Sequence, residues 1–239
     1  MLSGGTRPAP SVHPHVLWAD CPAHGKISSV QLSSSQFITS NRLRHQSQMH
    51  IAILTFQGFN ELDSLVAFGV LNRIKNREWR VTLCCPEPEV TSMNGVTIQR
   101  QSSLEEAESA DAVIVGSGVL TREVVGSREL MGRLKLDPAR QLIAAQCSGT
   151  LVLAKLGLLG DVPACTDLTT RPWVQEAGVE VLHQPFFARG NLATAGGCLA
   201  SPYLAAWVIA RTEGMEAAAS ALHYVVRLLA RKTHMLRMR

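Results

Sequence analysis

Short runs of apolar residues alternate along this chain with longer segments of helical periodicity. The apolar runs predict buried strands at 50–56, 79–84, 111–115, 141–145, 179–182 and 192–195. Apolar residues spaced three and four apart predict helices at 62–77, 121–136, 170–177, 201–211 and 215–229. A hairpin is predicted at 90–98, because Asn94-Gly95 suits a tight turn. Strands that alternate with helices form a mainly parallel sheet with helices on both faces, so the fold class is α/β.

The two ends of the chain lack this pattern. Residues 1–48 are rich in Ser, Pro, His and Gln and show neither period, which predicts a disordered or spurious N-terminal extension. Residues 49–226 form the one predicted domain, and residues 227–239 are a basic C-terminal tail. His13, His15, Cys21 and His24 lie in the extension, where no core would hold ligand geometry. We therefore expect no metal site there.

Composition narrows the class of protein. The chain has 239 residues, 46% of them hydrophobic and 18% charged, which is typical of one globular domain with a full core. The net charge of +4 comes largely from the two ends, so we expect no nucleic-acid partner. Apolar runs stay short of the ~18 residues that cross a bilayer, so we expect no membrane partner. Six cysteines without a C-x-x-C pair predict free thiols in a reducing cytoplasm.

One cysteine stands where a predicted strand meets a helix. The strand ends near Gln146, Cys147-Ser148-Gly149 follows, and apolar residues from Leu151 onward continue as a helix. A residue at such a turn sits above the sheet edge, beside unpaired backbone N–H groups and the positive end of a helix dipole. These surroundings favour the thiolate form of a cysteine. We therefore predict a nucleophile elbow with Cys147 as the reactive residue.

The carboxyl ends of parallel strands meet at one edge of the sheet, so three strand ends should surround Cys147. Asp63 lies in the first turn of its helix and can point back toward the sulfur as an acid or base. The backbone N–H of Ser148 is predicted to form an oxyanion hole with that of Ser117 or Gly118. The predicted catalytic residues are Cys147, Asp63 and Ser148. The predicted substrate-binding or oxyanion-binding residues are Ser117, Gly118, Gly116 and Gly149. The three glycines would let main chain approach a substrate closely.

The remaining thiols and histidines of the domain have no predicted catalytic role. Free cysteines are most often buried, and an isolated histidine in apolar surroundings is most often structural. We expect core or peripheral thiols at Cys84, Cys85, Cys165 and Cys198, expect structural roles for His183 and His223, and leave the role of Asp167 open.

Four segments resemble the ThiJ/PfpI superfamily, a flavodoxin-like relative of the class I glutamine amidotransferases. They are the strand-Gly-Phe-x-x-x-Asp opening from Ile51 to Asp63, Asp-Ala-Val-Ile-Val-Gly-Ser-Gly from Asp111 to Gly118, Ala-x-Cys-Ser-Gly from Ala145 to Gly149, and Gly-Asn-Leu-Ala-Thr-Ala-Gly-Gly from Gly190 to Gly197. The resemblance covers residues 49–226. It implies a doubly wound, flavodoxin-like sheet, a cysteine at the elbow, an acid hydrogen-bonded to it, and a homodimer. Cys147 and Asp63 occupy the positions of that pair.

Departures from the family pattern bear on the reaction. Protease-like members carry His directly after the cysteine, where this chain has Ser148. Several members place a His in a Thr-Thr-His segment, where this chain has Cys165-Thr166-Asp167. A protease-type Cys-His triad is therefore not expected. The Cys–Asp pair with Ser148 resembles the subgroup of isonitrile hydratases. It also resembles the sensor-like half of certain transcription regulators, but the segment after Val226 is too short for their DNA-binding domain.

Two functional hypotheses remain. The first is a hydro-lyase or related hydrolase that uses Cys147 as nucleophile and Asp63 as acid and base on a small electrophile, without cofactor or metal. The resemblance makes an isonitrile the first candidate substrate. The second is a non-catalytic or redox-responsive protein whose Cys147 oxidises to a sulfinate held by Asp63 and nearby amides.

Overall fold

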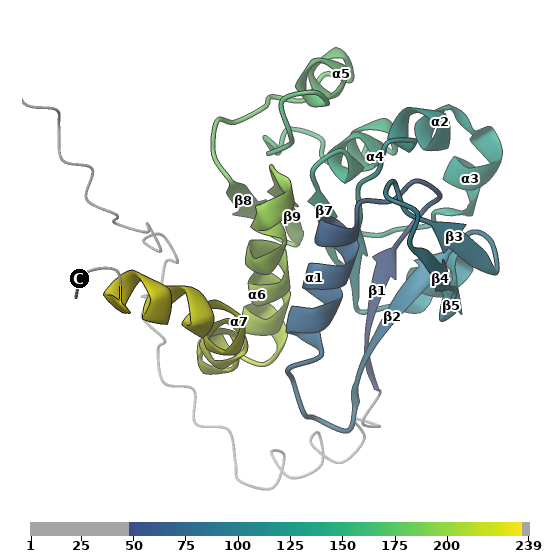
Figure 1. The fold of residues 1–239 in the computed structure, drawn as a ribbon. Helices are drawn as coiled ribbons and strands as arrows, with labels where there is room; N and C mark the ends of the chain where they lie inside the picture. The colour runs from purple at the N-terminus through teal and green to yellow at the C-terminus, as the bar shows by residue number, and fades with distance from the viewer. Residues whose placement is uncertain (1–47, 236–239) are drawn as a thin grey trace, which may run out of the picture. The chain divides into compact units, whose positions relative to one another are not determined.

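A seven-stranded sheet forms the centre of the domain (Figure 1). The computed structural model describes residues 48–235, with side chains up to residue 225; the predicted extension up to residue 47 and residues 236–239 lie outside the described range. The strand order is β5-β2-β1-β6-β7-β9-β8. The bounds are β1 (Met49–Leu54), β2 (Trp79–Cys85), β5 (Ser102–Ser103), β6 (Ala112–Val115), β7 (Leu142–Gln146), β8 (Phe186–Arg189) and β9 (Leu192–Ala195). Every pairing is parallel except that of β8 with β9, so the flavodoxin-like, doubly wound α/β fold is confirmed.

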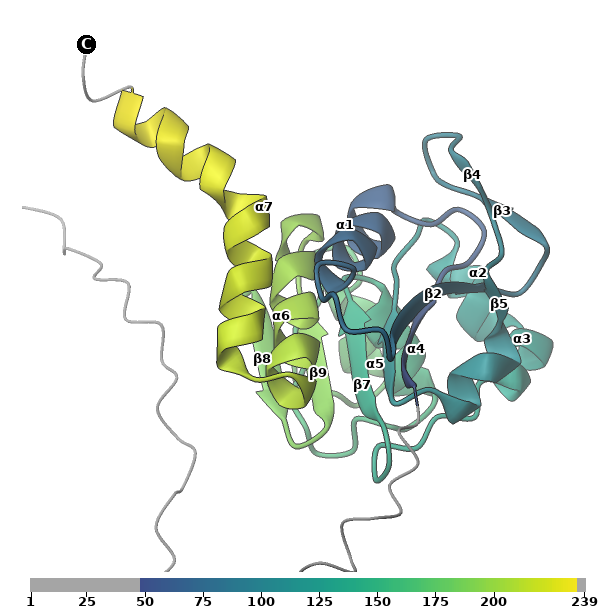
Figure 2. The same ribbon diagram turned by 90° about the horizontal axis from the view of Figure 1, so that it is seen from below.

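Alternate residues of the central strands supply two separate cores. Ile51, Ile53 and Ile114 pack against α1 (Glu61–Leu71), α6 (Ser201–Thr212) and α7 (Met215–Met235). On the opposite face, Leu54, Val113 and Val115 pack against α2 (Thr121–Gly126), α4 (Gly149–Lys155) and α5 (Arg171–Glu176). Figure 2 shows α6 beside both α1 and α7 on the first face. Burial of each Ile or Leu side chain contributes roughly 1.5–3 kcal/mol to the stability of the fold. The packing on both faces therefore fixes the sheet that carries the loops at its carboxyl edge.

Two predicted helices are shorter than their periodicity indicates. The first helix ends at Leu71, because the Asn72 side chain donates a hydrogen bond to the Phe68 carbonyl at 2.8 Å and closes the last turn. The segment predicted as one helix at 121–136 is two, α2 and α3 (Arg128–Arg133). Ser127 separates them, since its hydroxyl caps α3 by accepting a hydrogen bond from the Leu130 N–H at 3.2 Å.

The predicted strand at 179–182 is wrong. Only an isolated bridge between Ala164 and Val181 forms there. The sheet edge is instead β8, which the apolar pattern missed, and it pairs antiparallel with β9. Gly190 has φ +62, so the chain reverses within the two residues that join these strands.

The other predicted elements are present with shifted ends. β3 (Glu89–Thr91) and β4 (Thr97–Gln99) form the predicted hairpin, with a loop longer than a two-residue turn. A 3-10 helix, η1 (Leu104–Ser109), follows β5 and begins with a capping box of Ser103 and Glu106. A second 3-10 helix, η2 (Cys198–Ala200), follows β9. The last helix, α7, runs beyond its predicted end to Met235. Of the helices in the described range, none is long and apolar enough to cross a membrane.

Candidate active site

Cys147 occupies a strained turn between β7 and α4. Its φ is +53, and among residues 48–235 it is the one residue other than glycine with a positive φ. This left-handed conformation costs about 1–3 kcal/mol for a residue with a Cβ. Two hydrogen bonds hold it: the Cys147 N–H donates to the Ala195 carbonyl at 2.7 Å, and the Thr166 hydroxyl donates to the Cys147 carbonyl at 2.8 Å. The elbow predicted from the sequence therefore exists, and neighbouring elements pin it.

The glycines around the elbow permit close packing of main chain against main chain. A Cβ on Gly149 would lie 2.5 Å from the Val115 carbonyl oxygen and 2.6 Å from that of Gly116. A Cβ on Gly118 would lie 2.5 Å from the Gly58 carbonyl oxygen. Gly118 lines the cavity above Cys147, whereas Gly116 and Gly149 do not. Gly149 therefore lets the start of α4 pack against the end of β6. A Cβ on Gly116 would lie 2.6 Å from the Ser64 hydroxyl oxygen and 3.0 Å from the Leu54 carbonyl oxygen, so Gly116 lets β6 pack closely against α1 and β1.

Asp63 is a fully buried carboxyl beside the cysteine. It lies in the first turn of α1, which begins where the Asn60 side chain accepts a hydrogen bond from the Leu62 N–H at 3.1 Å. Its Oδ2 accepts a hydrogen bond from the Ser117 hydroxyl, and its Oδ1 meets no N–H or O–H donor among the described residues. Burial raises the pKa of Asp63 from 3.8 to about 6, against the opposing effect of Ser117 and the nearby thiols. Such a group changes protonation close to neutral pH.

The surroundings of Cys147 favour the neutral thiol, contrary to the sequence-based expectation. Burial raises its pKa most, and the negative charges of Asp63 and then Asp167 raise it further. The backbone N–H of Gly197 acts in the opposite direction but is outweighed. The helix that follows, α4, has only seven residues, and the two carboxyl groups oppose its dipole. A reaction that uses the Cys147 thiolate would therefore require a base to accept its proton.

A second cysteine lies in the site, which the sequence analysis missed. Ligand atoms of Asp63, Cys147 and Cys198 all lie within 4.8 Å of one another. The Asn60 side chain donates a hydrogen bond to the Cys198 sulfur at 3.0 Å. Cys198 follows β9, which pairs with β7 in the sheet, so its loop ends beside the elbow. The sequence signal is that both strands are followed by glycine and cysteine at the same edge. Cys84, Cys85 and Cys165 are fully buried in the core, as predicted.

The serines position main chain around the sulfur. The Ser148 hydroxyl lies 2.8 Å from that of Thr121 and accepts a hydrogen bond from the Gly118 N–H at 3.2 Å. The Gly118 N–H is therefore occupied. The N–H groups of Ser117 and Ser148 have no acceptor among the described residues, and both residues line the cavity. Of the two predicted oxyanion pairs, Ser148 with Ser117 is the one whose donors are free.

A cavity of about 430 Å³ opens above Cys147. Met93, Val119 and Trp173 form apolar parts of its wall, and Cys198 lies beside Cys147 in its lining. Arg122 and Asp167 supply opposite charges, and the Arg122 guanidinium lies 4.8 Å from the centre of the Trp173 ring. This size and mixed lining suit a small organic molecule with one polar end.

No histidine lines this cavity in the part of the chain that the structure describes. His183 lines a neighbouring cavity, where its Nε2 lies 2.7 Å from Nη1 of Arg171. His223 lies exposed on α7. Asp167 lies between the two cavities, and its Oδ1 accepts hydrogen bonds from the N–H groups of Thr169 and Thr170. The described site therefore pairs Cys147 with a carboxyl group.

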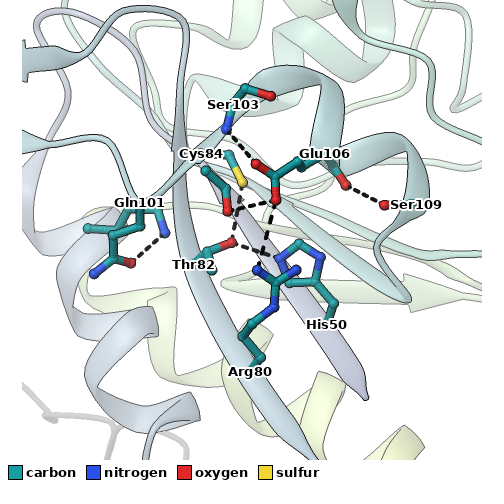
Figure 3. Close-up of polar contacts among 10 residues, drawn as sticks. His50, Arg80, Thr82, Cys84, Gln101, Ser103, Glu106 and Ser109 are labelled. Carbon is teal, nitrogen blue, oxygen red and sulfur yellow. Dashed lines mark hydrogen bonds and ion pairs between the residues drawn. The ribbon is translucent and has the colours of Figure 1, made fainter. Parts of the chain in front are cut away.

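A second polar cluster surrounds β2, and none of its labelled residues lines the cavity above Cys147 (Figure 3). His50, near the start of β1, lies with its Nε2 2.8 Å from the Thr82 hydroxyl. Arg80 forms an ion pair with Glu106 at 3.8 Å. Burial, followed by the charge of Arg80, lowers the pKa of His50. These residues join β1 and β2 to the 3-10 helix η1, so we assign the cluster a structural role.

A doubly wound sheet with a strained cysteine after a central strand and a buried carboxyl from the first helix defines a class of cysteine-elbow α/β proteins. Residues 49–211 match the DJ-1/PfpI family. That match covers more than half of the chain, which therefore belongs to the DJ-1/PfpI family. No curated protein is significantly similar to the chain in sequence.

Solved structures of this family have the same fold. A ThiJ/PfpI family protein from Pseudomonas syringae is 18% identical with a TM-score of 0.68, over 84% of this chain and 81% of that chain. Drosophila melanogaster DJ-1beta is 21% identical with a TM-score of 0.65, over 75% and 98% of the two chains. Oxidized Toxoplasma gondii DJ-1 is 18% identical with a TM-score of 0.63, over 74% and 98%. At these identities the likeness concerns the fold.

Proposed function

We propose that this protein is a cysteine-dependent enzyme that adds water to a small electrophile, with isonitriles as the substrate class. One observation carries the proposal: a buried carboxyl with a pKa of about 6, Asp63, lies against the neutral thiol of Cys147. At neutral pH most of Asp63 is ionised, so it can accept the thiol proton when a substrate arrives. Its Oδ1 is free for that proton, because the Ser117 hydroxyl occupies Oδ2.

The first half of the reaction forms a covalent intermediate. Asp63 Oδ1 takes the proton of Cys147 as the sulfur attacks the terminal carbon of the isonitrile. A C–S bond forms, and the electron pair left on carbon takes the proton back from Asp63. The product of this half-reaction is a thioimidate, in which carbon carries the sulfur, one hydrogen and a double bond to nitrogen. Asp63 is again a carboxylate.

The second half releases the product. Asp63 removes a proton from a water molecule as its oxygen attacks the thioimidate carbon, and that proton passes to nitrogen. The tetrahedral intermediate then collapses: a C=O bond forms, the C–S bond breaks, and the hydroxyl proton returns to sulfur through Asp63. Isonitrile plus water thus gives an N-substituted formamide. The free N–H groups of Ser117 and Ser148 are the donors we assign to the developing oxygen charge.

Turnover of a panel of small alkyl and aryl isonitriles tests this function. Loss of the isonitrile infrared band and appearance of the formamide proton by NMR should both depend on protein. Cys147→Ala should abolish turnover, and Asp63→Asn should lower it by about 100-fold or more, as for loss of a general base. Cys165→Ala removes a buried thiol outside the cavity and serves as the matched control. Equal rates for wild type and Cys147→Ala would overturn the proposal.

The pH dependence gives a second, independent test. Asp63 acts as base only when ionised, so kcat/KM should rise with pH and reach half of its plateau near the Asp63 pKa of about 6. Asp63→Asn should remove this step from the profile. A profile that instead rises near the pKa of a free thiol, about 8.5, would show that substrate meets a thiolate formed without Asp63.

Redox sensing is the second candidate function. The cavity gives a small oxidant access to Cys147, and the fold is shared with DJ-1 proteins, one of them solved in an oxidized form. In this candidate, peroxide oxidises Cys147 and no isonitrile turns over. Mass spectrometry after peroxide treatment, combined with the isonitrile assay, separates the two functions.

The assembly and compartment belong to the same proposal. The exposed apolar side chains of Leu168 and Leu199, each next in the chain to a cavity-lining residue, and of Tyr203 on α6 favour a homodimer that covers them. The five cysteines of the described range are all free, which favours a reducing compartment such as the cytoplasm. Sedimentation analysis of wild type should give twice the mass of one chain. Leu199→Glu should shift the measured mass toward that of a single chain.

A further inference from the structure

Two thiols in the cavity lining, Cys147 and Cys198, lie beside the buried carboxyl of Asp63, and the proposed hydration uses only one of the thiols. Cys147 is 6% exposed, whereas Cys198 is partly exposed at the cavity wall. Their sulfur atoms lie within 4.8 Å of each other, and each lies within the same distance of an Asp63 oxygen. The Asn60 side-chain amide donates a hydrogen bond to the Cys198 sulfur at 3.0 Å. The second thiol therefore has a fixed place in the site.

We propose that Cys198 is a resolving cysteine, which converts peroxide-oxidised Cys147 into a reversible Cys147–Cys198 disulfide. The inference rests on the oxidisable Cys147 of the second candidate function. It differs from that candidate in its product, a disulfide in place of a sulfinate. It assigns to Cys198 a redox role at a site that also carries the proposed enzyme reaction.

The first oxidation step follows from the position of Asp63. Asp63 Oδ1 accepts the Cys147 proton as the sulfur attacks one oxygen of hydrogen peroxide. An S–O bond forms, the O–O bond breaks, and the departing hydroxide takes the proton from Asp63 to become water. Sulfur loses two electrons and peroxide gains them, which leaves a sulfenic acid on Cys147.

The second step closes the disulfide. The Cys198 sulfur attacks the Cys147 sulfur, the S–O bond breaks, and the leaving hydroxide takes the Cys198 proton as water. Two thiols and one peroxide thus give one disulfide and two waters. A dithiol reductant returns both thiols by exchange.

The geometry favours disulfide closure over further oxidation. An S–S bond is about 2.05 Å long, so the sulfur atoms must approach by less than 3 Å from their largest possible separation of 4.8 Å. Rotation of two short side chains supplies such a movement. Cys198 begins a three-residue 3-10 helix directly after Gly196-Gly197. A neighbouring thiol reacts within the molecule, whereas sulfinate formation waits for a second peroxide to diffuse in.

Intact mass spectrometry and peptide mapping test the proposal. Wild-type chain treated with equimolar hydrogen peroxide should lose the mass of two hydrogens, regain it with dithiothreitol, and yield a linked peptide pair containing Cys147 and Cys198. With two or more equivalents of peroxide, Cys198→Ser should instead gain the mass of two oxygens at Cys147, which dithiothreitol does not remove. Cys165→Ser, which removes a thiol from the core, should behave as wild type.

A further variant tests whether the position of the Cys198 sulfur matters as well as its presence. Asn60→Ser keeps a capping hydroxyl for α1 but removes the amide that holds the Cys198 sulfur, so the sulfinate share should rise while both thiols remain. Circular dichroism checks that each variant is folded. Sulfinate formation at equal rates in wild type and Cys198→Ser would overturn the resolving role alone. Absence of any Cys147 oxidation would overturn the redox candidate as well.

Discussion

Ionised Asp63 should destabilise the folded protein, and the size of this effect follows from its pKa. The carboxyl is fully buried, and one hydrogen bond, from Ser117, compensates it. Burial raises its pKa from 3.8 to about 6. A tenfold change in a protonation equilibrium corresponds to about 1.36 kcal/mol. The higher pKa therefore makes ionised Asp63 about 3 kcal/mol less favourable in the folded state than in the unfolded state.

The sign of the pH dependence is set by which state holds the proton. Between pH 3.8 and about 6 the folded protein keeps a proton on Asp63 that the unfolded chain releases. The free energy of unfolding therefore falls as pH rises through this window and stays lower above it. Asp63→Asn keeps the shape and the acceptor for Ser117 but carries no charge. Its stability relative to wild type should thus grow by about 3 kcal/mol from the acid side of the window to the alkaline side.

Urea unfolding of wild type and Asp63→Asn at several values from about pH 4.5 to 8, under reducing conditions, measures about 2 kcal/mol of this difference, because Asp63 of the unfolded chain is already mostly ionised at pH 4.5. Other titrating groups are common to both proteins and cancel, provided that they do not couple to Asp63. The exposed Val96 supplies a control: Val96→Thr changes a side chain that carries no titrating group, so its difference from wild type should not change with pH. A difference for Asp63→Asn that stays constant, or that shrinks as pH rises, would refute the assignment of Asp63 as a buried acid of raised pKa.

The same variant should lose activity while it gains stability. Groups that serve chemistry are often unfavourable for folding, and their replacement then stabilises the protein. Asp63→Asn should therefore be more stable than wild type at about pH 8 and turn over isonitriles about 100-fold or more slowly. A variant that loses both properties would indicate that Asp63 is a structural acid.

Three further predictions follow from contacts around the site and the sheet. Gly149→Ala should lower the free energy of unfolding in urea by about 1–3 kcal/mol, because the added Cβ would lie 2.5 Å from main chain. Gly132→Ala in α3, where a Cβ meets nothing within 4 Å, should raise it by about 0.5–1 kcal/mol. Equal effects of the two substitutions would contradict the packing argument. Ser148→Ala should lower stability by about 1–3 kcal/mol, because it leaves the Gly118 N–H without its acceptor, and Ser148→Thr should restore it. Burial lowers the pKa of His50, so the folded state favours its neutral form, and the stability linked to this group is present above the unfolded pKa of 6.5 and is lost as pH falls. His50→Gln should therefore reduce the fall of the urea midpoint at acid pH. An equal fall in wild type and variant would refute this prediction.

The central strands and the elbow could be predicted from local pattern alone. The apolar runs around Ile53, Ile114 and Ile143 are each too short for a helix and become the buried strands β1, β6 and β7. Cys147 follows the third of these runs and precedes Gly149, which fits a strand-to-helix turn. The edge strand β8 escaped prediction because its residues are only partly buried, so its apolar signal is weak.

Cys198 could not be placed from local pattern, because its neighbour in space is 51 positions earlier in the chain. What brings the two cysteines together is the pairing of β7 with β9, in which Gln146 lies opposite Ala195. That register became visible only with the strand order. An isolated thiol after a strand is most often structural, and it is the distance from Asp63 and Cys147 that changes this interpretation.

The protonation state of Cys147 shows why position and reactivity are separate questions. The elbow determines where the Cys147 sulfur lies. The pKa of the thiol depends on burial and on the charges of two residues from other segments, Asp63 on α1 and Asp167 in the loop before α5. A neutral thiol is a poor nucleophile toward isonitrile and peroxide alike. Both proposed reactions therefore begin with the same proton transfer to Asp63 Oδ1. If so, Asp63→Asn must slow hydration and disulfide formation together, and a variant that slows only one would show that the two reactions reach the sulfur in different protonation states.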